Sequence, residues 1–281
     1  MQDYLITADK IAGYESYLQD EERAGGTVEK YLRDVRKFAK WLNGRPVTKE
    51  VVVEWKEKLV EEHYSPATVN SMLASIHGFF HCVGWENCNV RFLRIQRQMF
   101  REQKKELTKA EYTKLVNTAH AEHRERLALL IETICATGIR VSEVKYITME
   151  ALVQKKAEIS LKGKIRTILL PDKLVHKLKK YARKQKIVSG EIFITRNGSS
   201  ISRKQIWAEM KALCIRAGVE ATKVFPHNLR HLFARVFYKA NRDIASLADV
   251  LGHSSIETTR IYLLTTGAEY RCWLDKLELV N

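Results

Sequence analysis

Hydrophobic side chains recur at helical spacing along most of the first 95 residues. In "TVEKYLRDVRKFAKWLNG" one face carries four of them: Tyr31, Val35, Phe38 and Leu42. Thr27 is placed to cap the start of this helix, and Gly44 is placed to end it. A second such stretch, "SPATVNSMLASIHGFFHCVGW", opens with Ser65 as the cap and Pro66 in the first turn. These patterns predict a helical domain over residues 1–95.

The pattern changes in the rest of the chain. Residues 96–106 are polar, basic and weakly patterned, which predicts a linker. Thr108 and Glu111 have the spacing of a capping box, which predicts the first helix of a second domain over residues 107–281. Helical spacing then continues as far as Gly138.

Beyond Gly138 the spacing becomes that of strands. The segments "AEISL", "IRTILL" and "EIFIT" are short and rich in Ile, Leu and Thr, and "KGK" between the first two predicts a tight hairpin turn. Helical spacing resumes at Ser202. The predicted fold is therefore mainly α with a small antiparallel β-sheet (α+β), divided into an N-terminal helical domain and a C-terminal mixed domain.

Charge adds a class of partner to this picture. The net charge is +15, and it is unevenly placed: residues 1–95 hold 13 basic and 14 acidic side chains, whereas the remainder hold 35 and 19. Such an excess indicates a polyanionic partner. Basic positions that can contact DNA lie on the helix face opposite Tyr31 and in the linker: Lys30, Arg33, Lys37, Lys40, Arg97 and Arg101.

The composition also bears on location. No stretch approaches about 18 uncharged apolar residues, so no membrane span is expected. The N-terminus lacks the basic region and apolar run of a secretory signal. The five cysteines are scattered and include no C-x-x-C pair, which is typical of reduced thiols in a cytoplasmic protein.

Polar and charged residues form five short motifs in the second domain. "ATGIRVSEV" places an arginine after a helix-ending glycine, "LKGKIR" places two lysines at the hairpin turn, and "PHNLRH" puts a histidine and an arginine three apart on one helical face. "LGHSS" and "ETTRIY" follow, with the tyrosine nine residues after the histidine. The side chains concerned are Arg140, Lys162, Lys164, His227, Arg230, His253 and Tyr262.

This ordered set resembles the tyrosine recombinase (phage integrase) family, whose members include integrases and Xer-like resolvases. The resemblance covers nearly the whole chain, and the N-terminal half looks like the family's helical core-binding (SAM-like) domain. It implies a site-specific recombinase that cuts and rejoins double-stranded DNA at short inverted-repeat sites. It also implies a homotetramer acting on two DNA sites, with a monomer possible without DNA, and neither a metal nor another cofactor.

The residue types suit that chemistry. Tyr262 can attack phosphorus and hold the strand as a 3′-phosphotyrosine ester, which conserves the bond energy for religation. Arg140 and Arg230 can fork onto the non-bridging oxygens and stabilise the charge of the transition state. Lys162 can protonate the departing 5′ oxygen. The resemblance implies an acid/base role for His227 and a hydrogen bond from His253 to the phosphate.

Several points stay open in the sequence. Glu143, three residues after Arg140, is expected to orient the site. The turn "LKGKIR" is one residue shorter than the usual family hairpin, so the catalytic lysine is Lys162 or Lys164, and Lys162 is favoured because it precedes the glycine. His231 is expected to be structural. Two other functions compete with recombination: a DNA-binding protein that does not cleave, and a type IB topoisomerase.

The end of the sequence predicts one more element. Residues 267–281 carry an apolar stripe at helical spacing, which predicts a short tail helix that needs a surface to pack on. That surface is its own domain or, as the resemblance to the family implies, a neighbouring protomer.

Overall fold

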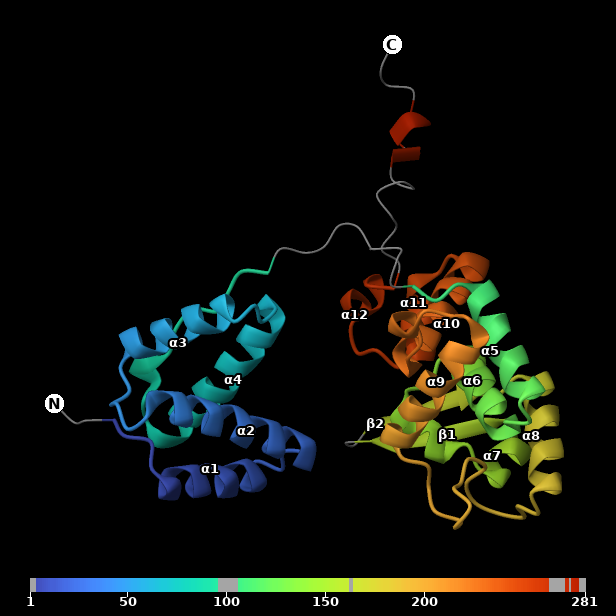
Figure 1. Ribbon diagram of the computed structural model, residues 1–281, viewed down its shortest axis with the longest axis horizontal. Coiled ribbons are helices and arrows are strands. Elements are labelled where there is room, and N and C mark those ends of the chain that lie inside the picture. Colours follow the sequence, from blue (N-terminus) through green and yellow to red (C-terminus); the bar gives the residue numbers. More distant parts are fainter. Residues whose placement is uncertain (1–3, 96–105, 162–163, 263–270, 273, 278–281) are drawn as a thin grey trace. The chain divides into compact units, whose positions relative to one another are not determined.

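The computed structural model describes residues 4–95, 106–161, 164–262, 271–272 and 274–277 (Figure 1). The chain divides into two compact units, Met1–Arg97 and Gln98–Asn281. Both are dominated by helices, as the sequence predicts. Within the described ranges, no helix combines the length and apolar character that a membrane crossing requires.

Amphipathic helices build the N-terminal unit, and each buries one face. Its elements are α1 (Ala8–Asp20), α2 (Gly25–Leu42), α3 (Lys49–Glu61), α4 (Pro66–Val83) and the 3-10 helix η1 (Glu86–Cys88). Val35, Phe38 and Leu42 of α2 are buried in one core with Trp55 and Phe80. The predicted stripe on α2 is therefore the side that faces this core.

The two predicted helix starts in this unit have different outcomes. Ser65 caps α4 and Pro66 occupies its first turn, as predicted. The predicted start of α2 is wrong by three residues, because α2 begins at Gly25 with Ala24 at the N-cap position. The backbone amide of Thr27 already donates to the Ala24 carbonyl, so Thr27 lies inside the first turn instead of capping it.

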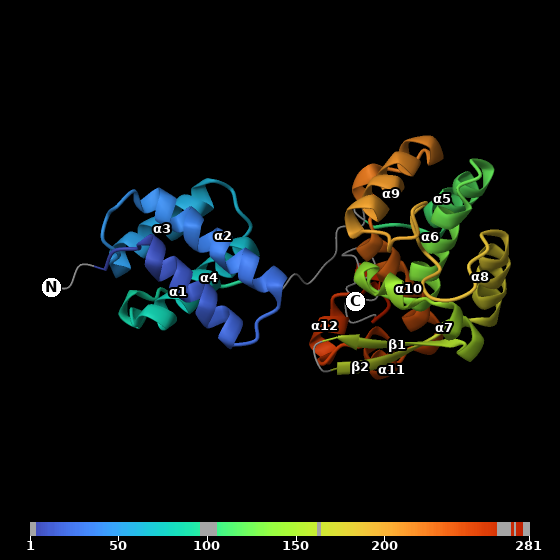
Figure 2. The same ribbon diagram turned by 90° about the horizontal axis from the view of Figure 1, so that it is seen from below.

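The C-terminal unit packs helices around one largely buried helix. Its elements are α5 (Lys109–Ala121), α6 (Glu125–Thr137), η3 (Val141–Tyr146), α7 (Met149–Gln154), β1 (Lys156–Leu161), β2 (Lys164–Leu169), α8 (Asp172–Lys184), α9 (Arg203–Ala217), η4 (Ala221–Lys223), α10 (Pro226–Asn241), α11 (Ile244–Leu251) and α12 (Ile256–Arg260). Helix α6 packs against α5, α8 and α10 (Figures 1 and 2). Its near-continuous apolar run fits this interior position.

The predicted caps in this unit are confirmed. Thr108 and Glu111 form a reciprocal capping box at the start of α5. Gly138 ends α6 with a left-handed backbone. Helical structure resumes beside Ser202 as predicted, and the Ser202 side chain caps α9.

The sheet is smaller than the sequence predicts. Strands β1 and β2 pair antiparallel, and Leu161 lies opposite Lys164. The predicted third strand, "EIFIT", is wrong, because Glu191 and Ile194 form only isolated bridges. The amide of Ile192 donates to the carbonyl of Ile147 before α7, so this segment bonds to a neighbouring turn and to itself and not to β2.

The predicted linker and tail fall largely outside the described residues. In the linker only Glu106 is described, and Arg235 of α10 holds it by an ion pair and also donates to the backbone carbonyl of Leu107. In the tail, Arg271, Cys272, Leu274 and Asp275 are helical and exposed. Docking of the tail on a neighbouring protomer stays a prediction.

Candidate active site

The turn after α6 places the first arginine of the site. Gly138 adopts a φ of +65°, and a side chain there would collide with the ring of Phe233. The chain then enters η3 with Arg140 at its N-cap. The buried carboxylate of Glu143 accepts from the Arg140 backbone amide at 2.7 Å and pairs with its guanidinium at 2.9 Å. Glu143 thereby fixes both the backbone and the side chain of Arg140, whose side chain remains 44% exposed.

Arg230 reaches the same place from α10, but it is buried. Its guanidinium donates to the backbone carbonyls of Gly138 and Leu251, the latter at 2.7 Å. The same Nη2 lies 3.0 Å from Nε2 of His253. These bonds tie the end of α6, α10 and the end of α11 to one side chain, so the position of Arg230 depends on the fold of the whole unit.

A third arginine, Arg166 of β2, belongs to the cluster although the sequence analysis did not single it out. It pairs with Glu143 at 3.2 Å and donates to the carbonyl of Leu251. Its buried Nε has no hydrogen-bond partner among the described residues. Gly252, with a φ of +63°, allows this approach, because a side chain there would collide with Arg166. Strand alternation offered a signal, since Arg166 shares the inward face with buried Ile168.

The positive charge of the three guanidinium groups exceeds the negative charge beside them. Burial, followed by the neighbouring arginines, lowers the pKa of Arg166 to about 10, while Glu143 offsets part of the shift. Burial and Arg140 also lower the pKa of Arg230. Arginine stays protonated at neutral pH in spite of such shifts. Three cations against one carboxylate leave a net positive site that an anion such as a phosphate would relieve.

Tyr262 follows α12 and lies against this cluster. Tyr262 is only 3% exposed, and its phenol oxygen accepts a hydrogen bond from Arg230. The ring centroid lies 4.4 Å from that of His231, 5.7 Å from that of His253 and 6.1 Å from that of His227. His227 is exposed and contacts His231 edge-on at 4.5 Å. The spacing of His227 and Arg230 along α10 therefore brings both to the tyrosine, and His231 packs on its ring.

His253 is held between two polar partners. Its Nε2 faces Arg230, which can only donate, so Nε2 accepts and the ring proton lies on Nδ1. Nδ1 then donates to Oγ1 of the buried Thr259 at 2.9 Å. Thr259 is a second residue of the site that the sequence analysis did not name. In this arrangement His253 has no proton on Nε2 to give, and its predicted hydrogen bond to a phosphate stays a prediction.

The protonation of His253 gives a pH dependence that can be measured. Burial, with Arg230 as the next cause, lowers its pKa from 6.5 to about 4. Between these values the unfolded chain binds a proton at this position and the folded protein does not, so the free energy of unfolding falls as the pH falls. We expect the stability advantage of the parent protein over His253→Asn to shrink between about pH 6.5 and 4 in thermal melts. An NMR titration of His253 with a midpoint near 6.5 would contradict this.

The other predicted site residues differ in whether the structure describes them and in how far their side chains are exposed. Lys162, Arg97 and Arg101 lie outside the described residues, and Lys164 opens β2. In the N-terminal unit, Lys30 is committed internally, since its ammonium lies 2.9 Å from the buried carboxylate of Asp34. Lys37 contacts the Tyr64 hydroxyl at 2.8 Å. Arg33 and Lys40 are exposed on the same helix.

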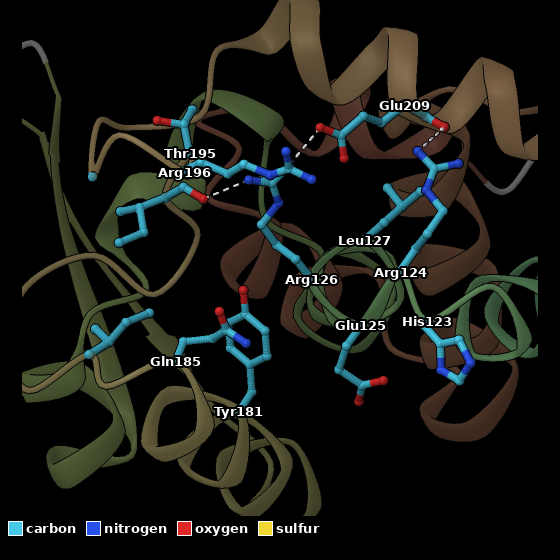
Figure 3. A pocket seen from close by; sticks show the side chains of 13 residues that line it. His123, Arg124, Glu125, Arg126, Leu127, Tyr181, Gln185, Thr195, Arg196 and Glu209 are labelled. Atoms are coloured by element: carbon cyan, nitrogen blue, oxygen red, sulfur yellow. Dashed lines mark hydrogen bonds and ion pairs between the residues drawn. The ribbon is translucent and has the colours of Figure 1, made fainter.

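A hollow of about 620 Å³ in the C-terminal unit lies apart from this cluster (Figure 3). It is bounded by the start of α6, the end of α8, the turn near Arg196 and Glu209 of α9, and it includes none of the predicted catalytic residues. Arg126 inside it bonds to the Ile194 carbonyl at 2.7 Å and to Glu209 at 2.6 Å. The cationic side chain at its centre is thus already satisfied by the protein.

Comparison with known families matches both units. Residues 105–267 match the phage integrase family, and residues 11–87 match the phage integrase N-terminal SAM-like domain. Tyrosine recombinase XerA of Pyrococcus furiosus is 27% identical over 100% of this chain and 98% of its own. Tyrosine recombinase XerD of Vibrio cholerae is 24% identical, with 85% of each chain covered.

Solved structures of low sequence identity share the fold. A lambda integrase tetramer bound to a Holliday junction has a TM-score of 0.74 at 17% identity, covering 93% of this chain and 78% of that one. The integrase of the Tn1549 transposon in complex with transposon end DNA has a TM-score of 0.71 at 16% identity, covering 95% and 99%.

Proposed function

Since this chain belongs to the phage integrase family, we propose that it is a site-specific DNA recombinase that cleaves and rejoins strands through a covalent 3′-phosphotyrosine at Tyr262. The observation that supports this most is the meeting of the Tyr262 phenol with Arg230 inside a cluster of three arginines. A nucleophile beside an unneutralised cationic site is the arrangement that attack on a phosphodiester requires.

In this proposal the cluster binds the scissile phosphate. Arg140 extends to solvent from a backbone fixed by Glu143, so its planar fork can meet two phosphate oxygens without reorganisation. Arg230 and Arg166 lie beside each other, since both donate to the carbonyl of Leu251, and the buried Nε of Arg166 has no partner among the described residues. Charge that builds on the five-coordinate phosphorus is thus met by donors already in place, which is the most effective use of electrostatics in a site.

Proton transfers fall to the surrounding groups. The phenol of a tyrosine has an ordinary pKa near 10, so the attacking oxygen needs a partner that favours its anion or takes its proton. Arg230 donates to the phenol oxygen, and His227, whose exposed ring lies 6.1 Å from that of Tyr262, is placed to take the proton. The departing 5′ oxygen receives its proton from the hairpin lysine.

The lysine assignment leads to a specific test. Lys162→Ala is expected to slow cleavage strongly, and a substrate with sulfur at the 5′ bridging position is expected to restore much of the rate, because a thiolate leaves without a proton. Lys164→Ala is expected to weaken DNA binding slightly and to gain nothing from the sulfur. Single-turnover cleavage of the oxygen and sulfur substrates by both variants gives the comparison. Rescue of Lys164→Ala alone would reassign the role to Lys164.

DNA contact in the N-terminal unit is proposed for the exposed end of the α2 basic face. Lys40 and Arg33 are exposed there, and Lys37 is partly so. Lys30 is the weakest member of the predicted set, because its ammonium is held by the buried carboxylate of Asp34, the hydroxyl of Ser75 and the carbonyl of Ser71. The linker residues Arg97 and Arg101 complete the proposed set.

The assembly follows from the same family. Lambda integrase forms a tetramer on a Holliday junction, and other relatives are solved as complexes with DNA. We propose a homotetramer acting on two double-stranded sites with short inverted repeats, a monomer in the absence of DNA, and action in the cytoplasm. No metal or other cofactor enters the reaction as proposed.

Covalent capture from DNA of random sequence tests this function. The protein is incubated with a library of supercoiled plasmids carrying random inserts, denatured with detergent, and the DNA that stays attached is sequenced. We expect enriched inserts with an inverted repeat and, on plasmids carrying two such sites, exchanged products. Relaxed plasmid without exchange or sequence enrichment would indicate a topoisomerase, and the absence of attached DNA would contradict any cleaving activity.

A further inference from the structure

Helix α8 carries a concentration of positive charge that the catalytic cluster does not use. Between residues 172 and 186 seven side chains are Lys or Arg and one, Asp172, is acidic. Asp172 is itself paired with Lys155 at 2.8 Å. A helix face whose only role is contact with water commonly carries both basic and acidic side chains. The near absence of acids along this helix therefore indicates an anionic partner.

The lysines of α8 are arranged in a line. Spacings of four, three and four residues put four of them on one edge of the helix: Lys173, Lys177, Lys180 and Lys184. All four are exposed, and the opposite edge of α8 is buried. The stripe extends over about 16 Å at a rise of 1.5 Å per residue, which matches the axial length of about five phosphates on one DNA strand.

The stripe borders a hollow. Lys177, Lys180 and Lys184 line a cavity of about 380 Å³ together with His120 and Glu125. It adjoins the hollow of Figure 3, with which it shares Glu125 and Tyr181.

Two carboxylates near the stripe are already matched. Glu125 bonds to His120 at 2.8 Å, and Glu132 pairs with Lys177 at 2.6 Å. Within the described part of the chain, Lys173, Lys180 and Lys184 form no ion pair. The ammonium groups of these three lysines can therefore bind an external anion.

The position of α8 separates this stripe from the catalytic cluster. Helix α8 packs on α6 and α7, and it lies on the side of the unit away from α12, which precedes Tyr262 (Figures 1 and 2). The buried helix α6 packs against both α8 and α10. The lysine stripe therefore faces away from a duplex that is bound at Tyr262.

We propose that the stripe from Lys173 to Lys184 binds the phosphate backbone of a second segment of duplex DNA. The proposal rests on the proposed function, which brings DNA to the protein. Lysine contacts phosphates as a point charge and reads no bases, so this binding is independent of sequence. Tyr181, which lines the same hollow, is buried and presents no open ring for stacking, which favours a duplex over a single strand. Such a surface retains flanking or incoming DNA while the active site holds the site to be cut.

Charge-neutral variants test this directly. In Lys173→Gln/Lys180→Gln/Lys184→Gln the paired Lys177 is kept so that Glu132 stays matched, and Gln preserves helix propensity. Lys109→Gln/Lys114→Gln/Lys239→Gln removes the same charge from exposed positions elsewhere in the unit. Arginine at the three stripe positions restores the charge. The probe is a random-sequence duplex, used for affinity as a function of salt and for lysine acetylation footprinting by mass spectrometry.

We expect the duplex to protect Lys180 and Lys184 from acetylation. We also expect the slope of log affinity against log salt to fall by about 2 to 3 in the glutamine stripe variant only, because each phosphate that a lysine neutralises adds about 0.9 to that slope. An equal fall in the control variant, or protection by phosphatidylserine vesicles and not by duplex, overturns the proposal. Covalent capture is run on the same proteins. If the parent protein captures no DNA, the proposed function alone is refuted. If capture is lost only in the glutamine stripe variant, the stripe binds the duplex held in the active site, and the proposal of a second DNA-binding surface is overturned.

Discussion

Tyr262→Phe is expected to bind DNA with unchanged affinity and to form no covalent adduct. The ring of Tyr262 packs on His231 at 4.4 Å and on His253 at 5.7 Å, and phenylalanine keeps both contacts. The variant loses only the phenol oxygen and its hydrogen bond with Arg230, which costs about 1 kcal/mol of stability. Arg230 remains anchored by the carbonyls of Gly138 and Leu251. The fold and the cationic site therefore persist while the nucleophile is gone.

The measurement is adduct formation on a substrate nicked near the cut site, read on a denaturing gel and mapped by peptide mass spectrometry. Tyr238→Phe is the matched control, because Tyr238 is a partly buried tyrosine packed against the same hydrophobic cluster. It should form the adduct at the parent rate. An adduct that survives in Tyr262→Phe, or that maps to another tyrosine, would refute the assignment of the nucleophile.

Local chemistry explains what the sequence could predict. Ser65, Thr108 and Ser202 cap the helices that follow them because a hydroxyl two or three residues before an orphan amide acts within a single turn. Gly138 ends α6 because its backbone takes a left-handed conformation that side chains disfavour. The same locality puts His227 and Arg230 on one side of α10. Predictions that depend on four or five neighbouring residues therefore agree with the structure.

The rest of the site depends on contacts between distant segments. Arg166 joins the cluster because β2 passes beside Gly252 and Glu143, which are 86 and 23 residues away in the chain. His231 packs on Tyr262 only because α12 returns to α10. No short pattern encodes either contact, although an arginine on the inward side of a strand could have drawn attention to Arg166.

Tertiary context overrode one prediction and gave the side chain named in another an interior partner. "EIFIT" has the composition of a strand, but its amides bond to the turn before α7 and to its own following turn. Lys30 belongs to a basic helical face, yet its ammonium bonds Ser75 and Asp34 in the interior. Composition shows which conformations and partners are available, and only packing decides which are used.

Among the arginines, Arg230 is the harder one to test by mutation. It is buried, and Arg230→Ala would leave the carbonyl of Gly138 without its donor, at a cost of about 1–3 kcal/mol for an unsatisfied group. The carbonyl of Leu251 would lose one of its two donors and keep Arg166. A loss of activity in that variant would mix instability with chemistry. Arg140 avoids this problem, because its side chain is 44% exposed and Glu143 keeps Arg166 and the backbone amide of residue 140 as partners.

Arg140→Ala is therefore expected to keep its melting temperature and its DNA affinity while cleaving about 100 to 1000 times more slowly, the usual cost of about 2.7–4 kcal/mol for removing one transition-state donor. Arg140→Lys is not expected to recover the rate, because an ammonium cannot fork onto two oxygens. Arg216→Ala is the matched control: Arg216 is exposed and pairs with Glu122 at 2.9 Å, the distance of the Arg140–Glu143 pair. Single-turnover cleavage on a nicked substrate, with affinity measured separately, distinguishes the two effects. Full activity of Arg140→Lys, or a fall in affinity that matches the fall in rate, would show that Arg140 serves only to hold DNA.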